Sequence, residues 1–349
     1  MSIEILPVAG IGEVRPGDDL AGLIAGAAGW LRDGDVVVVT SKIVSKAEGR
    51  LVDLPGDEAD RAATLEAALR AETARVVARR GPVRIVQTHH GFVMAAAGID
   101  NSNVDPDRLV LLPKDPDASA RAVRAALRQR FGRRVAVVVS DTMGRAWRNG
   151  QTDVALGAAG IPAIRDHRGE VDPYGNLLQV TEIAVVDQLA GAAELVKGKF
   201  DRVPVAVVRG CGLTGDEPDG PGVAVLIRDA AQDLFPLGSA EARAAGLRDA
   251  ATLPDAAPER GADAARVAAA IAAVAGAVAP GTVIATNPGV RGHELTVGLA
   301  EPGDAAALVR LGADAHRLRA ALAAEGLAST VLSPGPPVLI LAGSGRAGS

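Results

Sequence analysis

Short apolar runs rich in valine and isoleucine recur along the first two thirds of the chain, separated by longer amphipathic segments. Their length and β-branched content are typical of buried strands. We expect strands at residues 35–40, 83–88, 109–112, 134–140 and 203–208. The strands are mixed with helical segments but do not alternate regularly with them. The pattern therefore predicts an α+β fold of mixed α/β character, and not a doubly wound sheet.

Helical periodicity appears between these runs. The helices expected from it are a short one after Asp18 and Asp19, and longer ones at residues 57–79, 117–130 and 181–197. Asp18, Asp19 and Thr181 are residue types that favour the N-cap position.

The composition changes near residue 247. Residues 247–262 contain Pro254, Pro258 and Gly261, and this content is typical of a linker. We therefore expect one domain at residues 1–246 and a small α/β extension at residues 263–349. Within the extension, the pattern predicts helices at residues 264–277 and 302–325 and a strand at residues 338–342.

Composition excludes several classes of protein. The 349 residues are 48% hydrophobic but only 2% aromatic, so the core must be built from small aliphatic side chains. The net charge is −5 with no basic run, which argues against general nucleic-acid binding. Cys211 is the only cysteine, which excludes a disulfide framework and a cysteine-based zinc site. The sequence has no secretory signal and no apolar run of about 18 residues, so we expect a soluble cytoplasmic protein with no membrane partner.

The strand expected at residues 134–140 leads into a segment with several polar side chains. Asp141 and Thr142 offer two hard oxygen ligands at the end of a strand, where α/β proteins place ligand groups. Arg145 and Arg148 follow, and guanidinium groups bind phosphate or carboxylate. Taken alone, the segment is equally typical of a solvated turn.

Three further segments carry candidate chemistry. Residues 89–104 lead into a polar tip with Asp100 and Asn103, which suits a hard cation or an ordinary Asx-rich turn. Ser41, Lys42 and Lys46 follow the strand at residues 35–40, and hydroxyl and ammonium groups there suit nucleotide phosphates or a plain surface loop.

The last of the three is the segment Lys197-Gly198-Lys199. It could close over phosphates or simply end a helix. Phe200 occupies the place that a P-loop reserves for serine or threonine, so any nucleotide is bound without a Walker A motif.

Together with residues 10–20 and 203–210, these segments resemble in order and spacing the coenzyme F420-0:L-glutamate ligase family, also called coenzyme F420:γ-glutamyl ligase. The similarity covers residues 1–245. The junction at residues 228–238 is similar to that of the actinobacterial fused type, in which a nitroreductase-like flavin domain follows. Residues 263–349 are too few for that domain, so they are either a shortened, degenerate remnant of it or an unrelated extension, and FMN is not expected.

The resemblance implies an intertwined homodimer that uses GTP and Mg²⁺ or Mn²⁺, with K⁺ as a further candidate cation. Such ligases join coenzyme F420-0 to L-glutamate through an acyl phosphate and then add γ-linked glutamates. The resemblance assigns the metal to Asp100, Asp141 and Thr142. We also assign catalytic roles to Asp141, Arg145 and Arg148.

The residues expected to contact GTP come from four segments. They are Ile11, Gly12, Glu13 and Val14; Ser41, Lys42 and Lys46; Asn103; and Lys197, Gly198 and Lys199.

Two alternatives stay open on the sequence. One is a related nucleotide-dependent carboxylate–amine ligase that acts on another substrate. The other is a non-catalytic nucleotide-binding protein.

Overall fold

The computed structural model describes residues 2–100, 106–198, 201–212, 218–289 and 292–345. The chain divides into two compact units, Met1–Glu241 and Ala242–Ser349. The helix α6 (Ser239–Ala251) crosses this division and extends into the segment expected as a linker.

The first unit is built on a five-stranded sheet with strand order β1-β12-β2-β8-β9. Its strands are β1 (Glu4–Pro7), β2 (Val36–Thr40), β8 (Ala136–Arg145), β9 (Arg148–Ala159) and β12 (Val205–Arg209). Only β2 and β8 pair in parallel, while the other neighbours are antiparallel. This mixed sheet confirms the α+β prediction.

Helices cover both faces of the sheet. One face packs against α1 (Leu20–Ala27), α2 (Ser41–Ala47) and α4 (Pro116–Phe131), and the other against α5 (Val185–Lys197). The two faces of each strand alternate between these cores: Val37 and Val39 face one, Val36 and Val38 the other. A strand that is buried on both faces needs this continuous apolar run, which is why the sequence pattern identifies β2 and β8.

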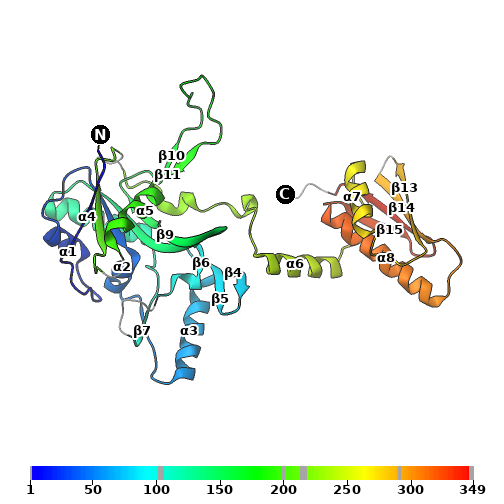
Figure 1. The fold of residues 1–349 in the computed structure, drawn as a ribbon, viewed down its shortest axis with the longest axis horizontal. Coiled ribbons are helices and arrows are strands. Elements are labelled where there is room, and N and C mark those ends of the chain that lie inside the picture. The colour runs from blue at the N-terminus through cyan, green and yellow to red at the C-terminus, as the bar shows by residue number, and fades with distance from the viewer. Residues whose placement is uncertain (1, 101–105, 199–200, 213–217, 290–291, 346–349) are drawn as a thin grey trace. The chain divides into compact units, whose positions relative to one another are not determined.

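A smaller set of elements lies beside the sheet. It consists of the helix α3 (Glu58–Glu72), the short pair β3 (Leu51–Asp53) and β7 (Arg108–Val110), the three-stranded sheet β4 (Thr73–Arg80), β5 (Val83–Thr88) and β6 (Val93–Ala95), and the 3₁₀ turn η1 (Ala96–Gly98). Two strands, β10 (Ile164–Asp166) and β11 (Glu182–Ala184), pair at the base of a projecting ribbon (Figure 1). The turns η2 (Gly222–Leu226) and η3 (Ala230–Gln232) precede α6.

The structure corrects several expected boundaries. The helix expected at residues 57–79 ends at Glu72, because the following residues pair with β5 as the strand β4. The helix expected from Thr181 begins at Val185, because residues 182–184 pair with β10. Asp19 is at the N-cap position of α1, as expected, and its carboxylate also pairs with Arg130.

The second unit has its own sheet and core. Its four antiparallel strands have the order β13-β14-β16-β15 and pack against two helices. The elements are α7 (Ala264–Val274), β13 (Thr282–Gly289), β14 (Gly292–Leu299), α8 (Ala305–Ala324), β15 (Ala328–Ser333) and β16 (Val338–Gly343). The pattern predicted both helices and β16 but missed the other strands. None of the described helices of the chain has both the length and the apolar character needed to cross a bilayer.

Candidate active site

The carboxyl ends of β2 and β8 meet at one edge of the sheet. Thr40 and Ser140 are partners in the parallel register, so the residues that follow each strand are neighbours. Ser41 begins α2, and its hydroxyl group hydrogen bonds the carboxylate of Asp141 on β8. Two polar segments that are a hundred residues apart in the sequence therefore converge where α/β proteins bind ligands.

The Asp141 carboxyl group lies in an environment that disfavours its charge. Burial is the main cause that raises its pKa to about 6, and the negative charges of Asp153 and Asp100 raise it further. Hydrogen bonds from the Thr142 backbone and the Ser41 hydroxyl group act in the opposite direction. A partly buried carboxylate with two acidic neighbours attracts a cation.

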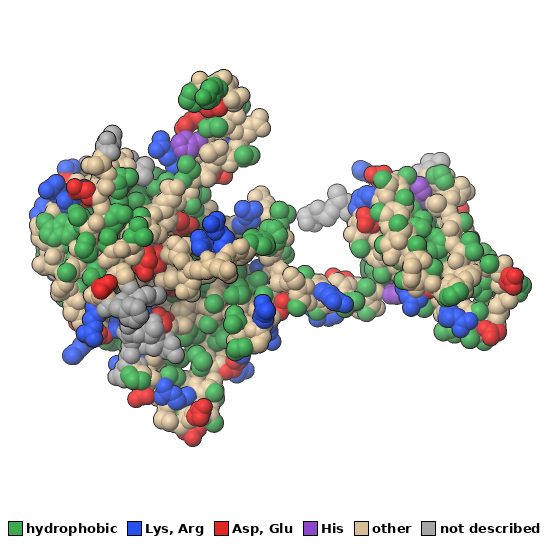
Figure 2. All heavy atoms as spheres, viewed as in Figure 1, with side chains coloured by type: hydrophobic (Ala, Val, Ile, Leu, Met, Phe, Trp, Pro, Cys, Tyr) green, Lys and Arg blue, Asp and Glu red, His purple; other side chains and the backbone are tan. Residues whose placement is uncertain are grey.

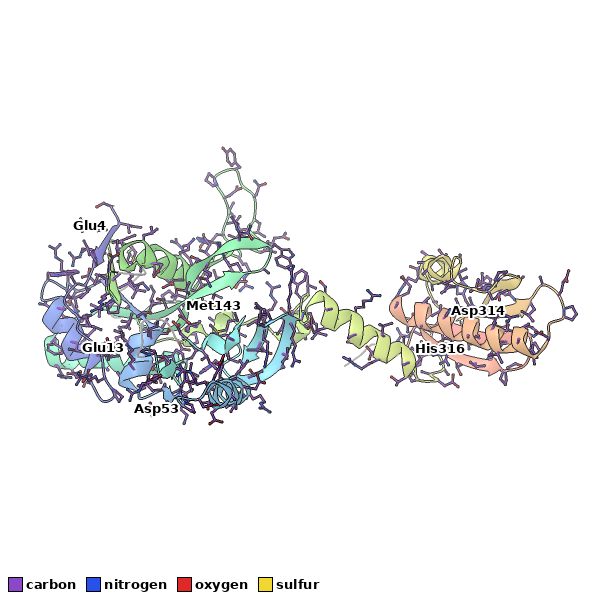
Figure 3. All side chains as sticks on the ribbon, turned by 60° about the horizontal axis from the view of Figure 1, so that its bottom comes forward. Glu4, Glu13, Asp53, Met143, Asp314 and His316 are labelled. Carbon is purple, nitrogen blue, oxygen red and sulfur yellow. The ribbon has the colours of Figure 1, made fainter. Side chains whose placement is uncertain are left out.

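The two lysines of α2 pair with acidic residues at this edge. The Nζ atom of Lys42 lies 2.7 Å from Oδ2 of Asp100. The Nζ atom of Lys46 lies 2.5 Å from Oε1 of Glu13, which belongs to the loop between β1 and α1 (Figure 3). The segment expected as a Ser/Lys-rich loop is thus a short helix, and Ser41, Ser45 and Lys46 are buried.

A buried polar network lies close to Asp141, where β8, β9 and α5 meet. Lys197, the last residue of α5, places Nζ 2.6 Å from Oδ2 of Asp153 and donates to the Ser140 hydroxyl oxygen at 2.8 Å. The hydroxyl groups of Ser140 and Thr142 each donate to Asp153 at 2.9 Å. Lys197 is 2% exposed and Asp153 is 3% exposed. Every polar group of this network therefore has a partner, as buried groups require.

These segments surround a cavity of about 930 Å³, a volume within the usual range for small-molecule sites. It brings together nine of the residues proposed from the sequence: Ile11, Gly12, Glu13, Val14, Lys42, Lys46, Thr142, Lys197 and Gly198. Ser41, Asp100 and Asp141 do not line it. Its basic side chains outnumber its acidic ones; the former are Arg15, Lys42, Lys46, Arg108, Lys197 and Arg202, and the latter Glu13, Asp153 and Glu194. An excess of positive charge in a cleft concentrates anionic ligands.

The donor set near Asp141 is chemically suited to a hard divalent cation. Asp100 and Asp141 supply carboxylate oxygens, and their charges are close enough to affect each other. Thr142 uses its hydroxyl hydrogen for Asp153, so its oxygen can offer lone pairs to a cation. Within the described residues, however, no group of three or more His, Cys, Asp or Glu side chains is arranged to hold a metal ion.

Arg145 and Arg148 lie apart from this cavity. The strand expected to end at residue 140 continues as β8 to Arg145, turns at Ala146 and Trp147, and returns as β9. Both arginines are exposed, pair with each other's backbone at the end of this hairpin, and do not line the cavity. Asn103 and Lys199 lie outside the described residues.

The sequence interpretation missed four charged residues of the cavity: Arg15, Arg108, Asp153 and Glu194. Asp153 carried the clearest signal, because it is an isolated acid that precedes the apolar run Val154-Ala155-Leu156. An acid in a strand that is otherwise buried must find a partner, and here it is Lys197.

Residues 10–210, which include all of these cavity segments, match the model of the F420-0:Gamma-glutamyl ligase family. The chain belongs to this family of amide-forming ligases.

Curated relatives agree with this assignment. The chain is 40% identical over 251 residues to the coenzyme F420:L-glutamate ligase of Methanothermobacter thermautotrophicus, a match that covers 67% of this chain and 99% of the relative. It is 41% identical over 247 residues to the protein of the same name from Methanopyrus kandleri, covering 67% of this chain and 98% of that one. It is 43% identical over 249 residues to the protein of the same name from Haloarcula marismortui, a match that covers 66% of this chain and 95% of that protein.

Proposed function

We propose that this protein joins L-glutamate to coenzyme F420-0 at the expense of GTP, and then adds further glutamates through γ-linkages. The observation that carries the proposal is the cavity with an excess of basic side chains, which Thr142 lines, in a member of this ligase family. The relatives are named for coenzyme F420 and L-glutamate, and the family is named for F420-0.

The basic side chains would hold the triphosphate. Lys46 is 7% exposed and lines the cavity, so its ammonium group would interact with phosphate oxygens in a medium of low dielectric constant. Its partner Glu13 is mostly exposed and can turn away when a nucleotide arrives.

Asp100, Asp141 and Thr142 would hold Mg²⁺ or Mn²⁺, which supplies positive charge against the phosphate oxygens during transfer. The Lys42 ammonium group now contacts Asp100 and would move toward phosphate once a cation takes that carboxylate. Asp153 would keep the Thr142 hydroxyl group oriented, because it accepts the hydroxyl hydrogen and is itself fixed by Lys197.

Two displacement steps account for the reaction. A carboxylate oxygen of the acceptor bonds to the γ-phosphorus of GTP and the bond to GDP breaks, which gives an acyl phosphate. The α-amino nitrogen of glutamate then bonds to the acyl carbon, phosphate leaves with the bonding pair, and the amine loses a proton. The cavity residues contribute mainly by positioning the groups and by electrostatic stabilisation, as in other phosphoryl transfers.

We also propose that the protein is a homodimer. The ribbon between β10 and β11 projects from the first unit and ends in apolar side chains (Figure 2). Val171, Tyr174, Leu177 and Val180 on this ribbon are all exposed. A two-stranded ribbon with exposed apolar residues is marginal alone, and a second copy of the chain would bury them.

Incubation of the protein with F420-0, GTP, Mg²⁺ and glutamate tests the activity. We expect product masses that increase by one glutamyl residue at a time, with one GDP and one phosphate released for each. Asp141→Asn is the matched control and should form no product. Activity on other carboxylates alone would favour a related ligase, and GTP binding without GDP release would favour a non-catalytic protein.

A further inference from the structure

The end of the β8–β9 hairpin presents an aromatic side chain in an unusual setting. Trp147 is 80% exposed and has a φ of 60°, a backbone conformation that bulky residues seldom adopt. The ring of Phe235, 62% exposed, meets it edge-on with 4.7 Å between the ring centroids. The whole chain has only two tryptophans, one tyrosine and four phenylalanines. A high aromatic content therefore does not explain why two large rings lie exposed side by side.

The aromatic pair is held in place from both sides. Trp147 is in the two-residue turn between paired strands, so the hairpin fixes its backbone. Phe235 is followed by Pro236, whose carbonyl oxygen accepts a hydrogen bond from the Arg75 guanidinium group on β4. The rings therefore form a preorganised apolar surface, which lowers the entropy cost of binding a flat ligand.

Two cations flank this surface. Arg145 and Arg148 directly precede and follow the turn, and across the described part of the chain neither forms an ion pair. Guanidinium groups without acidic partners, beside exposed rings, suit a ligand that is both aromatic and anionic.

The same hairpin leads back to the reacting groups. Arg145 lies three strand residues beyond Thr142, about 10 Å along β8. A ligand stacked at Trp147 could therefore extend a flexible arm along the hairpin to the cavity edge.

We propose that Trp147 and Phe235 bind the deazaflavin ring of F420-0, with Arg145 and Arg148 on the phosphodiester of its arm. This inference rests on the proposed function. The ring would stack on the aromatic pair at the turn, and the arm would pass the two arginines that flank the turn before it follows the hairpin. The arm then ends in the carboxylate that becomes the acyl donor, at the edge where Asp141 and Thr142 lie. Arg145 and Arg148 thus contact the acceptor substrate and not the γ-phosphate of GTP.

The deazaflavin is fluorescent, so its anisotropy measures binding to the full-length protein without turnover. We expect Trp147→Leu to raise the Kd for F420-0 about tenfold, and Trp147→Phe to restore most of the affinity. Trp30→Leu is the matched control, because Trp30 stacks against Arg209 elsewhere in the fold and should leave the Kd unchanged.

A second probe separates the ring from the anionic arm. The ring–ribityl fragment without the phosphodiester should bind more weakly in Trp147→Leu but equally well in Arg148→Gln. Intact F420-0 should be weakened by both. Equal Kd values for F420-0 in the wild type and Trp147→Leu would overturn the proposal. So would dissociation of a homodimer in Trp147→Leu, measured by light scattering, because it would assign the rings to a contact between copies.

A different result would contradict the proposed function alone: a wild type that binds F420-0 but adds no glutamate to it.

Discussion

The ammonium group of Lys197 lies 2.6 Å from a carboxylate oxygen of Asp153, and the two side chains are almost completely buried. Lys197 ends α5 and Asp153 is on β9, so the pair joins two layers of the fold. Because Asp153 also accepts the hydroxyl hydrogen of Thr142, the pair links packing to the candidate metal site.

Removal of the Lys197 ammonium group should destabilise the protein strongly. We expect Lys197→Met to lower the free energy of unfolding by about 3–5 kcal/mol, because it leaves the Asp153 carboxylate buried without a counter-ion. Asp153→Asn should cost less, since Lys197 keeps a second acidic neighbour in Glu194 at 3.4 Å. Urea denaturation followed by circular dichroism measures both.

The double variant Lys197→Met/Asp153→Asn is the control for this explanation. It buries no charge and should be more stable than Lys197→Met alone. A double variant as unstable as the sum of the single ones would show that packing, and not the ion pair, accounts for the loss.

Metal binding should depend on pH through Asp141. The pKa of this carboxyl group is raised to about 6, chiefly by burial, so in the metal-free protein it is protonated below that pH. A divalent cation binds the carboxylate and displaces the proton. Mg²⁺ should therefore raise the melting temperature at pH 7.5 but much less at pH 5.

The sign of this effect can be checked with one variant. The pKa of Asp141 is higher in the folded protein than in the unfolded chain, so the folded state binds the proton more tightly. The metal-free protein therefore loses stability as the pH rises from about 4 to 6. Asp141→Asn cannot titrate, so it should lose both this dependence and the response to Mg²⁺. A response to Mg²⁺ in Asp141→Asn equal to that of the wild type would contradict the assignment of this ligand.

The convergence of the site could be predicted from the sequence only in part. Val36–Thr40 is a continuous apolar run, and the pattern correctly places polar residues at the ends of this strand and of the one that contains Val139. Their proximity depends on the parallel register of β2 and β8, a pairing of segments that are a hundred residues apart and that no local pattern encodes.

Other features depend on non-local pairing even more. Residues 73–80 continue the helical periodicity of α3, but pairing with β5 makes them a strand. The sequence pattern places Arg145 and Arg148 in one loop with Asp141, whereas the hairpin with β9 carries them away from the cavity. Asp153 gains its role only because α5 ends beside β9. In each case tertiary contacts decide between local alternatives.

Lys46 should contribute to the binding of GTP more than to the fold. Its ammonium group lies at the cavity wall, and charge-assisted hydrogen bonds contribute about 1.5–3 kcal/mol. We expect Lys46→Met to raise the KM for GTP at least tenfold. Steady-state assays at saturating F420-0 and glutamate measure this value. Lys114→Met is the matched control because Lys114 is exposed and does not line the cavity. An unchanged KM in Lys46→Met would remove this residue from the phosphate site.

The first unit should fold and catalyse without the second. The core of the second unit, around Leu295 and Leu318, shares no residue with the cores around the five-stranded sheet. The family match lies wholly within the first unit, and relatives named as ligases are covered almost completely by two thirds of this chain. We expect a protein that ends after Ala251 to melt cooperatively and to add the first glutamate at a rate close to that of the full chain.

Mass spectrometry of the same reactions shows whether the number of added glutamates changes. A truncated protein that melts cooperatively but adds no glutamate would place an essential residue beyond Ala251.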